Sequence, residues 1–126
     1  AGGVGITPML SILRYFSQNN KNQKVILFWG MNNRSELICS NEFEAFQKEM
    51  SNFVFVPVMA KDESFDGEKG FITSEKLEKA INANGYDVRN LQYFICGPAI
   101  MQSSVLNSLV ALNVKKHNIH YESFSL

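Results

Sequence analysis

Three short stretches hold the residues whose types and spacing suit chemistry. The chain opens AGGVGITPML, with Gly2, Gly3 and Gly5 ahead of Thr7 and Pro8 and then an apolar helical pattern. Glycines let a backbone turn tightly and approach a ligand closely, and a helix N-terminus attracts phosphate groups. The stretch therefore predicts a pyrophosphate-binding turn. A flexible glycine-rich tail is the alternative, because Pro8 stands where the G-x-G-x-x-G pattern has its third glycine.

The second stretch is residues 96–101, CGPAIM, at the predicted junction of a strand and a helix. A lone cysteine in an apolar run is most often a buried structural residue. Here Gly97 and Pro98 directly follow Cys96, which indicates a special backbone turn. We expect this turn on the same edge of the sheet as the glycine loop.

The third stretch is the tail, residues 120–126, HYESFSL. Glu122 is an acid at a predicted strand end, and an ordinary exposed carboxylate is the alternative interpretation. Phe124 is an aromatic near the carboxyl terminus, where such residues often only anchor the core. His117 and His120 have no metal-ligand spacing with a cysteine or a carboxylate pair, so the sequence predicts no metal site.

Strands and helices are expected to alternate along the whole chain. A helix is predicted with Thr7 as its N-cap and Pro8 as its first residue. The continuous apolar runs fit strands buried on both faces, and Pro57 indicates that one of them lies at an edge or is irregular there. The predicted strands are residues 24–29, 53–59, 91–96 and 119–124. The other helices are predicted from a cap at Ser40 or Asn41 to near Met50, from a cap at Thr73 to about Ala83, and from Pro98 to about Leu112.

This alternation predicts an α/β fold, a doubly wound, mostly parallel Rossmann-like sheet with helices on both faces. Residues 1–126 are expected to form one domain. A glycine turn that opens a helix normally follows a strand, and no residue precedes Ala1 here. We therefore expect the first strand to be missing and the chain to be a fragment of a longer protein.

Composition excludes several classes of partner. The 12 basic and 12 acidic residues cancel, which argues against nucleic acid or an anionic membrane as a partner. No apolar run approaches the ~20 residues of a membrane span, so a membrane is expected only if a longer parent carries a membrane domain. Two cysteines are too few for a disulfide framework and indicate a reducing, cytoplasmic setting.

Taken together, the three stretches resemble the pyridine-nucleotide domain of the ferredoxin–NADP reductase superfamily. The resemblance rests on AGGVGITP, then CGPxxM, then a terminal E-x-F, and it spans the whole chain. Residues 27–37, LFWGMNNRSEL, and residues 67–73, GEKGFIT, look like its ferric reductase, NADPH oxidase and NADH:flavin reductase branches.

The resemblance implies a role for each matching residue. The loop that holds the pyrophosphate corresponds to Gly2, Gly3, Gly5, Ile6, Thr7 and Pro8. The segment beside the adenosine ribose corresponds to Gly30, Met31, Asn32, Asn33 and Arg34. Cys96, Gly97 and Pro98 match the turn beside the nicotinamide, Met101 falls where the family packs the nucleotide, and Glu122 and Phe124 match the tail near the nicotinamide and flavin. Cys96, Glu122 and Phe124 are thus the candidate catalytic residues.

Two departures leave the choice between NADH and NADPH open. Asn32 stands where members that select NADP often carry an arginine, which leaves Arg34 and Lys61 as candidates for a 2′-phosphate, with an ordinary solvated surface charge as the alternative for each. No acid directly follows the strand to bind a ribose diol, since Glu36 comes several residues later. Phe124 is also not terminal, because Ser125 and Leu126 follow it.

The resemblance implies an NAD(P)H-binding domain that places the nicotinamide for hydride transfer to FAD held by a separate upstream domain. Electrons would then pass singly to haem, an iron–sulfur protein, ferric iron or oxygen. The fragment alone is expected to be inactive. The alternatives are a non-catalytic nucleotide-binding or regulatory module of the same fold, and an α/β domain of another class.

Overall fold

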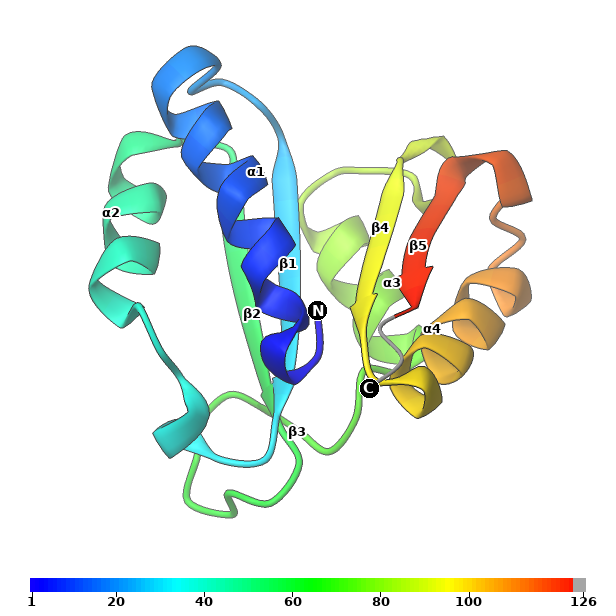
Figure 1. The fold of residues 1–126 in the computed structure, drawn as a ribbon. Helices are drawn as coiled ribbons and strands as arrows, with labels where there is room; N and C mark the ends of the chain where they lie inside the picture. The colour runs from blue at the N-terminus through cyan, green and yellow to red at the C-terminus, as the bar shows by residue number, and fades with distance from the viewer. Residues whose placement is uncertain (124–126) are drawn as a thin grey trace. The chain divides into compact units, whose positions relative to one another are not determined.

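The computed structural model describes the backbone of residues 1–123 and the side chains of residues 1–121. It consists of two compact units, Ala1–Phe71 and Ile72–Leu126. Phe124, one of the predicted site residues, lies outside the described residues. Each unit contains its own parallel sheet and its own helices, and each is described by itself below (Figure 1).

The first unit is a three-stranded parallel sheet in the order β1-β2-β3, with two helices. Its strands are β1 (Val25–Met31), β2 (Phe53–Met59) and the short β3 (Glu68–Lys69). Its α-helices are α1 (Ile6–Asn19) and α2 (Ser40–Glu49), and its 3-10 turns are η1 (Gly3–Gly5) and η2 (Arg34–Glu36). β3 pairs only with Val58 and Met59, so β2 has a free edge at Pro57, as predicted.

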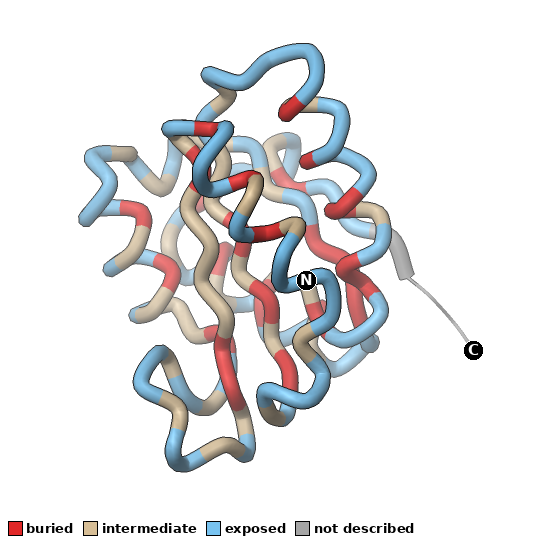
Figure 2. The backbone as a smooth tube through the Cα atoms, turned by 90° about the vertical axis from the view of Figure 1, so that its left-hand side faces the viewer, coloured by how far each residue is buried: buried red, intermediate tan, exposed pale blue. Residues whose placement is uncertain are grey.

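An aromatic cluster forms the core of the first unit. Trp29 on β1 is 2% exposed, and its ring lies 5.7 Å from Phe43 of α2 and 6.5 Å from Phe55 of β2. Phe43 and Phe55 stack on each other with centroids 4.7 Å apart. These three rings join both long strands to α2, and buried residues run along the strands and recur along the helices (Figure 2).

The second unit pairs β4 with β5 in parallel, packs α4 on these strands and packs α3 against α4. Its core is apolar and includes Leu77, Ile81, Ile95 and Leu109. Its elements are α3 (Ser74–Ala83), η3 (Val88–Asn90), β4 (Tyr93–Gly97), α4 (Ala99–Ala111), η4 (Lys116–Asn118) and β5 (Ile119–Ser123).

The predicted α/β class and the parallel pairing are confirmed, but the strands form two sheets rather than one. The reason lies at β1, whose edge away from β2 is paired only with the first residues of the chain. Gly30 N–H donates to the Ala1 carbonyl at 2.8 Å, and Gly2 forms a parallel bridge with Gly30. On this edge, away from β2, no described strand pairs with the rest of β1, so the ladder stops there. The strand expected ahead of the glycine loop remains a prediction.

Helix caps differ from the sequence prediction at two of the four helices. The α1 helix has Gly5 as its N-cap, so Thr7 and Pro8 lie inside its first turn, where a missing N–H costs no intrahelical bond. The α2 helix is capped by Cys39 in the left-handed conformation (φ 57°), not by Ser40 or Asn41. Thr73 caps α3 as predicted, since its Oγ1 accepts from Lys76 N–H at 3.3 Å, and Pro98 precedes α4.

Candidate nucleotide-binding site

The glycine loop is ordered by hydrogen bonds to β1. Gly5 N–H donates to the Gly2 carbonyl at 2.9 Å and closes the η1 turn. The indole Nε1 of Trp29 donates to the Gly3 carbonyl at 3.1 Å, which ties the loop to the core. These bonds favour an ordered turn over a flexible tail.

Gly3 is where this loop most needs a glycine. Its φ of 51° lies in the left-handed region that other residues enter at a cost of about 1–2 kcal/mol. A Cβ built there would meet no atom within 4 Å, and both Gly3 and Val4 are exposed. The loop therefore presents open backbone at the N-terminus of α1, which fits the approach of a phosphate group.

The other predicted loop residues support this turn. Ile6 is 1% exposed, and its N–H bonds the Gly3 and Val4 carbonyls. Thr7 is exposed, and its Oγ1 donates to the Val4 carbonyl at 3.0 Å rather than capping the helix. The Thr7 oxygen keeps its lone pairs, while Pro8 is half-buried.

The carboxyl end of β1 lies beside the same loop, because Gly30 bonds Ala1. Met31 is buried, and its carbonyl accepts from Ala60 N–H. Asn32 follows, and the Glu36 carboxylate folds back onto it. Asn32 N–H donates to Glu36 Oε2 at 2.9 Å and Asn32 Nδ2 donates to Glu36 Oε1 at 3.2 Å. The Glu36 carboxylate therefore lies at the carboxyl end of β1, although Glu36 follows Asn32 by four positions in the sequence.

Asn33 and Arg34 are also held in place. The side chain of Asn33 caps η2 by accepting from Ser35 N–H at 3.0 Å. The Arg34 guanidinium contacts Asp62 through Nε at 2.8 Å and Nη2 at 3.3 Å, and Nη2 also donates to Ser64 Oγ at 2.6 Å. Hydrogen bonding from Arg34 lowers the pKa of Asp62, so this carboxyl stays ionised at neutral pH.

In the second unit, the parallel pairing of β4 with β5 brings the backbones of Cys96 and Glu122 side by side. The two residues are partners in the parallel register of β4 and β5, and Gly97 is opposite Ser123. Cys96 is 3% exposed, Gly97 is buried and Pro98 is exposed. Two residues that are 26 positions apart in sequence and were predicted to act together are therefore neighbours across one ladder.

Gln102 of α4 contacts this turn, and the sequence analysis did not single it out. Its side chain is 8% exposed, and Nε2 donates to the Gly97 carbonyl at 2.8 Å. Its N–H also donates to the Pro98 carbonyl at 3.0 Å. The signal was a polar residue at a position of α4 where the helical period calls for an apolar one. Met101, which the sequence did select, is its half-buried neighbour.

We predict that Gln102→Leu loosens the Cys96–Pro98 turn. The change keeps the side-chain bulk but leaves the Gly97 carbonyl without this donor, which costs about 1–3 kcal/mol. Hydrogen exchange of the Cys96 and Gly97 amides measures the loss. Gln92→Leu is the control, because Gln92 is exposed and bonds Asn118 and His120 rather than the Cys96–Pro98 turn. Equal exchange in Gln102→Leu and the native protein would contradict the anchoring role.

The described residues contain neither a metal-ligand cluster nor a membrane-spanning helix. Across residues 1–121, no three His, Cys, Asp or Glu side chains are grouped closely enough to hold a metal ion. Within the described chain, no helix has the length and apolar character needed to cross a bilayer.

Comparison with known proteins identifies the family. Residues 1–107 match the model of the oxidoreductase NAD-binding domain, and the chain belongs to this family. It is 35% identical over 124 residues to flavohemoprotein A of Dictyostelium discoideum, covering 98% of this chain and 29% of that protein. It is 34% identical over 108 residues to NADH-cytochrome b5 reductase 2 of Candida glabrata, covering 82% of this chain and 35% of that protein.

Solved structures support the fold. The cytochrome P450 reductase GcoB of Amycolatopsis matches with a TM-score of 0.87 at 22% identity, over 100% of this chain and 36% of that one. The FAD/NAD-binding domain of a nitric oxide dioxygenase from Vibrio cholerae matches with a TM-score of 0.84 at 24% identity, over 98% of this chain and 48% of that one. The predicted membership of the ferredoxin reductase superfamily is confirmed. The chain spans about a third of the length of the curated relatives it matches.

Proposed function

We propose that this chain is the NAD(P)H-binding part of a flavin-dependent oxidoreductase. The observation that carries the proposal is the glycine loop, an open left-handed turn at the N-terminus of α1, hydrogen-bonded to the carboxyl end of a parallel strand. Ligands of parallel α/β sheets bind at this end of the strands. Family membership gives the loop its ligand, a pyridine dinucleotide.

The residues divide between the two halves of the dinucleotide. In the first unit, Gly2, Gly3, Gly5, Ile6, Thr7 and Pro8 hold the pyrophosphate, and Gly30, Met31, Asn32 and Arg34 form the segment beside the adenosine ribose. In the second unit, Cys96, Gly97, Pro98 and Met101 pack against the nicotinamide. Glu122 stabilises the charge on the nicotinamide ring. Phe124, which lies outside the described residues, covers the flavin.

Hydride transfer between two rings needs orientation and a dry pocket rather than a general base. When bound, NAD(P)H would supply the hydride for an FAD held by another domain. Here the buried Cys96 thiol excludes water from the Cys96–Pro98 turn. Because Gly97 has no side chain, the nicotinamide ring can approach the backbone closely.

The partners in this proposal come from the relatives. Their names include a flavohemoprotein, dioxygenase electron transfer components and a cytochrome b5 reductase. We infer an FAD-binding domain upstream of Ala1 and a haem or iron–sulfur acceptor beyond it. Cys39 and Cys96 are not joined in a disulfide, which suits a reducing compartment such as the cytoplasm.

Single-turnover flavin reduction in the full-length protein tests the proposal. Glu122→Gln is expected to slow reduction about tenfold, a loss of about 1.4 kcal/mol of transition-state stabilisation, while nucleotide affinity changes much less. Glu78→Gln on α3 is the matched control, because Glu78 is exposed and carries the same charge. A full-length protein that binds nucleotide but reduces no flavin would favour the non-catalytic alternative. Equal losses of rate and affinity would make Glu122 a binding residue only.

A further inference from the structure

We propose that this chain selects NADH over NADPH, with Glu36 binding the adenosine ribose and Asp62 withholding Arg34 from a 2′-phosphate. The inference rests on the proposed function and specifies the nucleotide that the site takes. All of its residues belong to the first unit and follow the carboxyl ends of β1 and β2.

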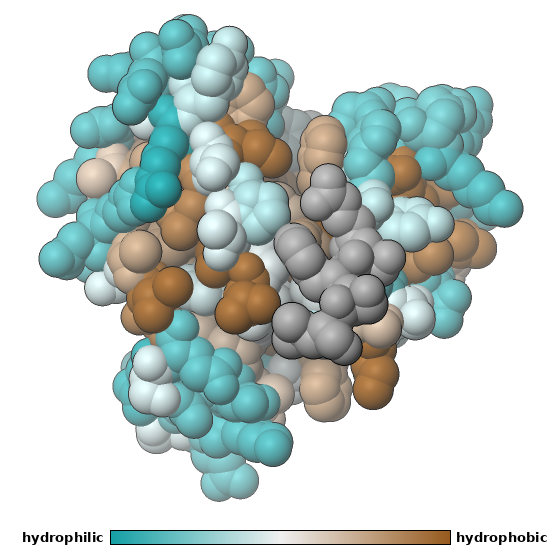
Figure 3. All heavy atoms as spheres, viewed as in Figure 1, coloured by the Kyte–Doolittle hydropathy of each residue, from teal (hydrophilic) through white to brown (hydrophobic). Residues whose placement is uncertain are grey.

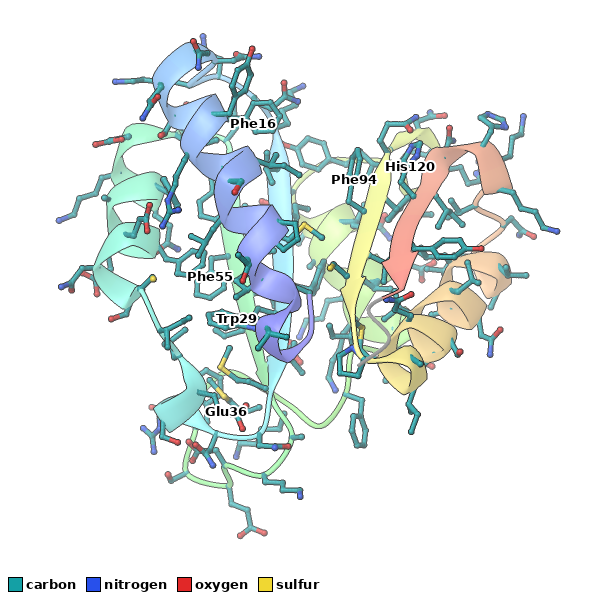
Figure 4. All side chains as sticks on the ribbon, viewed as in Figure 1. Phe16, Trp29, Glu36, Phe55, Phe94 and His120 are labelled. Carbon is teal, nitrogen blue, oxygen red and sulfur yellow. The ribbon has the colours of Figure 1, made fainter. Side chains whose placement is uncertain are left out.

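Glu36 has the chemistry of a ribose ligand. Both of its oxygens are engaged by Asn32, one by the backbone N–H and one by Nδ2, and these two bonds fix the carboxylate at the end of β1 (Figure 4). Each oxygen has a second lone pair, and Glu36 is exposed, so the carboxylate can still accept two hydroxyl groups. A fixed acid at this strand end is the arrangement that binds a ribose 2′-hydroxyl in dinucleotide folds.

The arginine that would bind a 2′-phosphate is already paired. The Asp62 carboxylate accepts hydrogen bonds from Nε and Nη2 of Arg34. Its Oδ2 also accepts a hydrogen bond from the Arg34 backbone N–H at 3.3 Å. Ser64 bonds both the guanidinium and Asp62 Oδ1, which closes a three-residue network. Asp62 is the less exposed partner, with a side-chain exposure of 12% against 55% for Arg34. A phosphate would have to displace a carboxylate that is held by several hydrogen bonds.

The surrounding charge also opposes a phosphate. The segments after the two strands, residues 30–36 and 60–70, carry five acids and three bases. Of the bases, Arg34 is bound to Asp62, and Lys69 Nζ donates to the Glu63 carbonyl at 2.7 Å. Figure 3 shows hydrophilic residues covering the loop beyond β1 and β2. A 2′-phosphate adds a charge of about −1.5 to −2, which this surface repels, whereas a neutral ribose hydroxyl does not suffer this repulsion.

The test uses two probes that differ only at this position, ADP-ribose and its 2′-phosphorylated form, titrated into the full-length protein by calorimetry. Native protein is expected to bind ADP-ribose at least about tenfold more tightly. Glu36→Gln is expected to weaken ADP-ribose binding severalfold. Asp62→Asn is expected to tighten binding of the phosphorylated probe about tenfold, because Arg34 is released, and adding Arg34→Met should abolish that gain.

Asp66→Asn is the matched control, since it removes one exposed acid from the same loop without touching Arg34. It is expected to change the affinity for either probe less than Asp62→Asn does. Equal affinity for the two probes, or tighter binding of the phosphorylated one, would overturn the inference. So would equal gains in Asp62→Asn and Asp66→Asn, which would make the effect one of net charge. Failure of native protein to bind either probe would overturn the proposed function, and this inference with it.

Discussion

Trp29→Ala is expected to lower the free energy of opening of β1 by about 3–5 kcal/mol, the usual cost of removing a large buried aromatic. Trp29 is 2% exposed, packs against Phe43 and Phe55, and bonds the glycine loop through its indole N–H. Figure 4 shows it beside Phe55 in the first unit. The loss should be measured by hydrogen exchange of residues 25–31 in the full-length protein.

Trp29→Phe separates the two roles of this side chain. It keeps an aromatic ring in the core but deletes the donor to the Gly3 carbonyl, so a smaller loss of about 0.5–1.5 kcal/mol is expected from the missing hydrogen bond, together with weaker nucleotide binding. If Trp29→Ala cost less than 1 kcal/mol, the aromatic cluster would not be the core of this unit. If Trp29→Phe left nucleotide affinity unchanged, loop anchoring would be unimportant for binding.

Gly3→Val is expected to weaken nucleotide binding roughly a hundredfold. The valine would occupy the face that the phosphate approaches and would force φ away from 51°. Each hydrogen bond to a charged group is worth about 1.5–3 kcal/mol, and 1.4 kcal/mol is tenfold in affinity. Calorimetric titration of the full-length protein with NAD⁺ measures the change.

Gly85→Val supplies the control for backbone strain. Gly85 also has a left-handed φ, 79°, and a Cβ there would also meet no atom within 4 Å. Both variants should pay a similar conformational cost of about 1–2 kcal/mol or more. Only Gly3→Val should lose affinity. Unchanged affinity in Gly3→Val would remove the pyrophosphate from this loop.

Strand limits and one helix cap were predictable because each depends on residues that are close together in the sequence. The run FVFVPVM is β2 with the predicted limits, and Thr73 caps α3 because its side chain bonds a backbone N–H three residues later. The helix start at Thr7 and Pro8 was wrong, because a 3-10 turn over Gly3–Gly5 precedes the helix and supplies its cap. Cys39 was missed because nothing in its residue type indicates a left-handed cap.

What the sequence did not reveal depends on contacts between distant residues. Glu36 was set aside as too far from the strand, yet the η2 turn carries its carboxylate back to Asn32. Arg34 was a candidate phosphate ligand until its pairing with Asp62, 28 positions away, was visible. Gln102 interrupts the apolar period of α4, but its partner is known only once the structure places the Gly97 carbonyl beside it. Each of these depends on a hydrogen bond that composition and periodicity do not encode.

The central proposal is that one pyridine dinucleotide is bound by the glycine loop and by the Cys96–Gly97–Pro98 turn. Hydrogen exchange of the full-length protein, with 5′-AMP and then with NAD⁺, tests it most directly. We predict that 5′-AMP slows exchange only in the ribose segment, residues 30–36. NAD⁺ should slow it there, in residues 2–7, and in residues 96–102. Protection by NAD⁺ that is absent from either the glycine loop or the Cys96 turn would contradict the proposal.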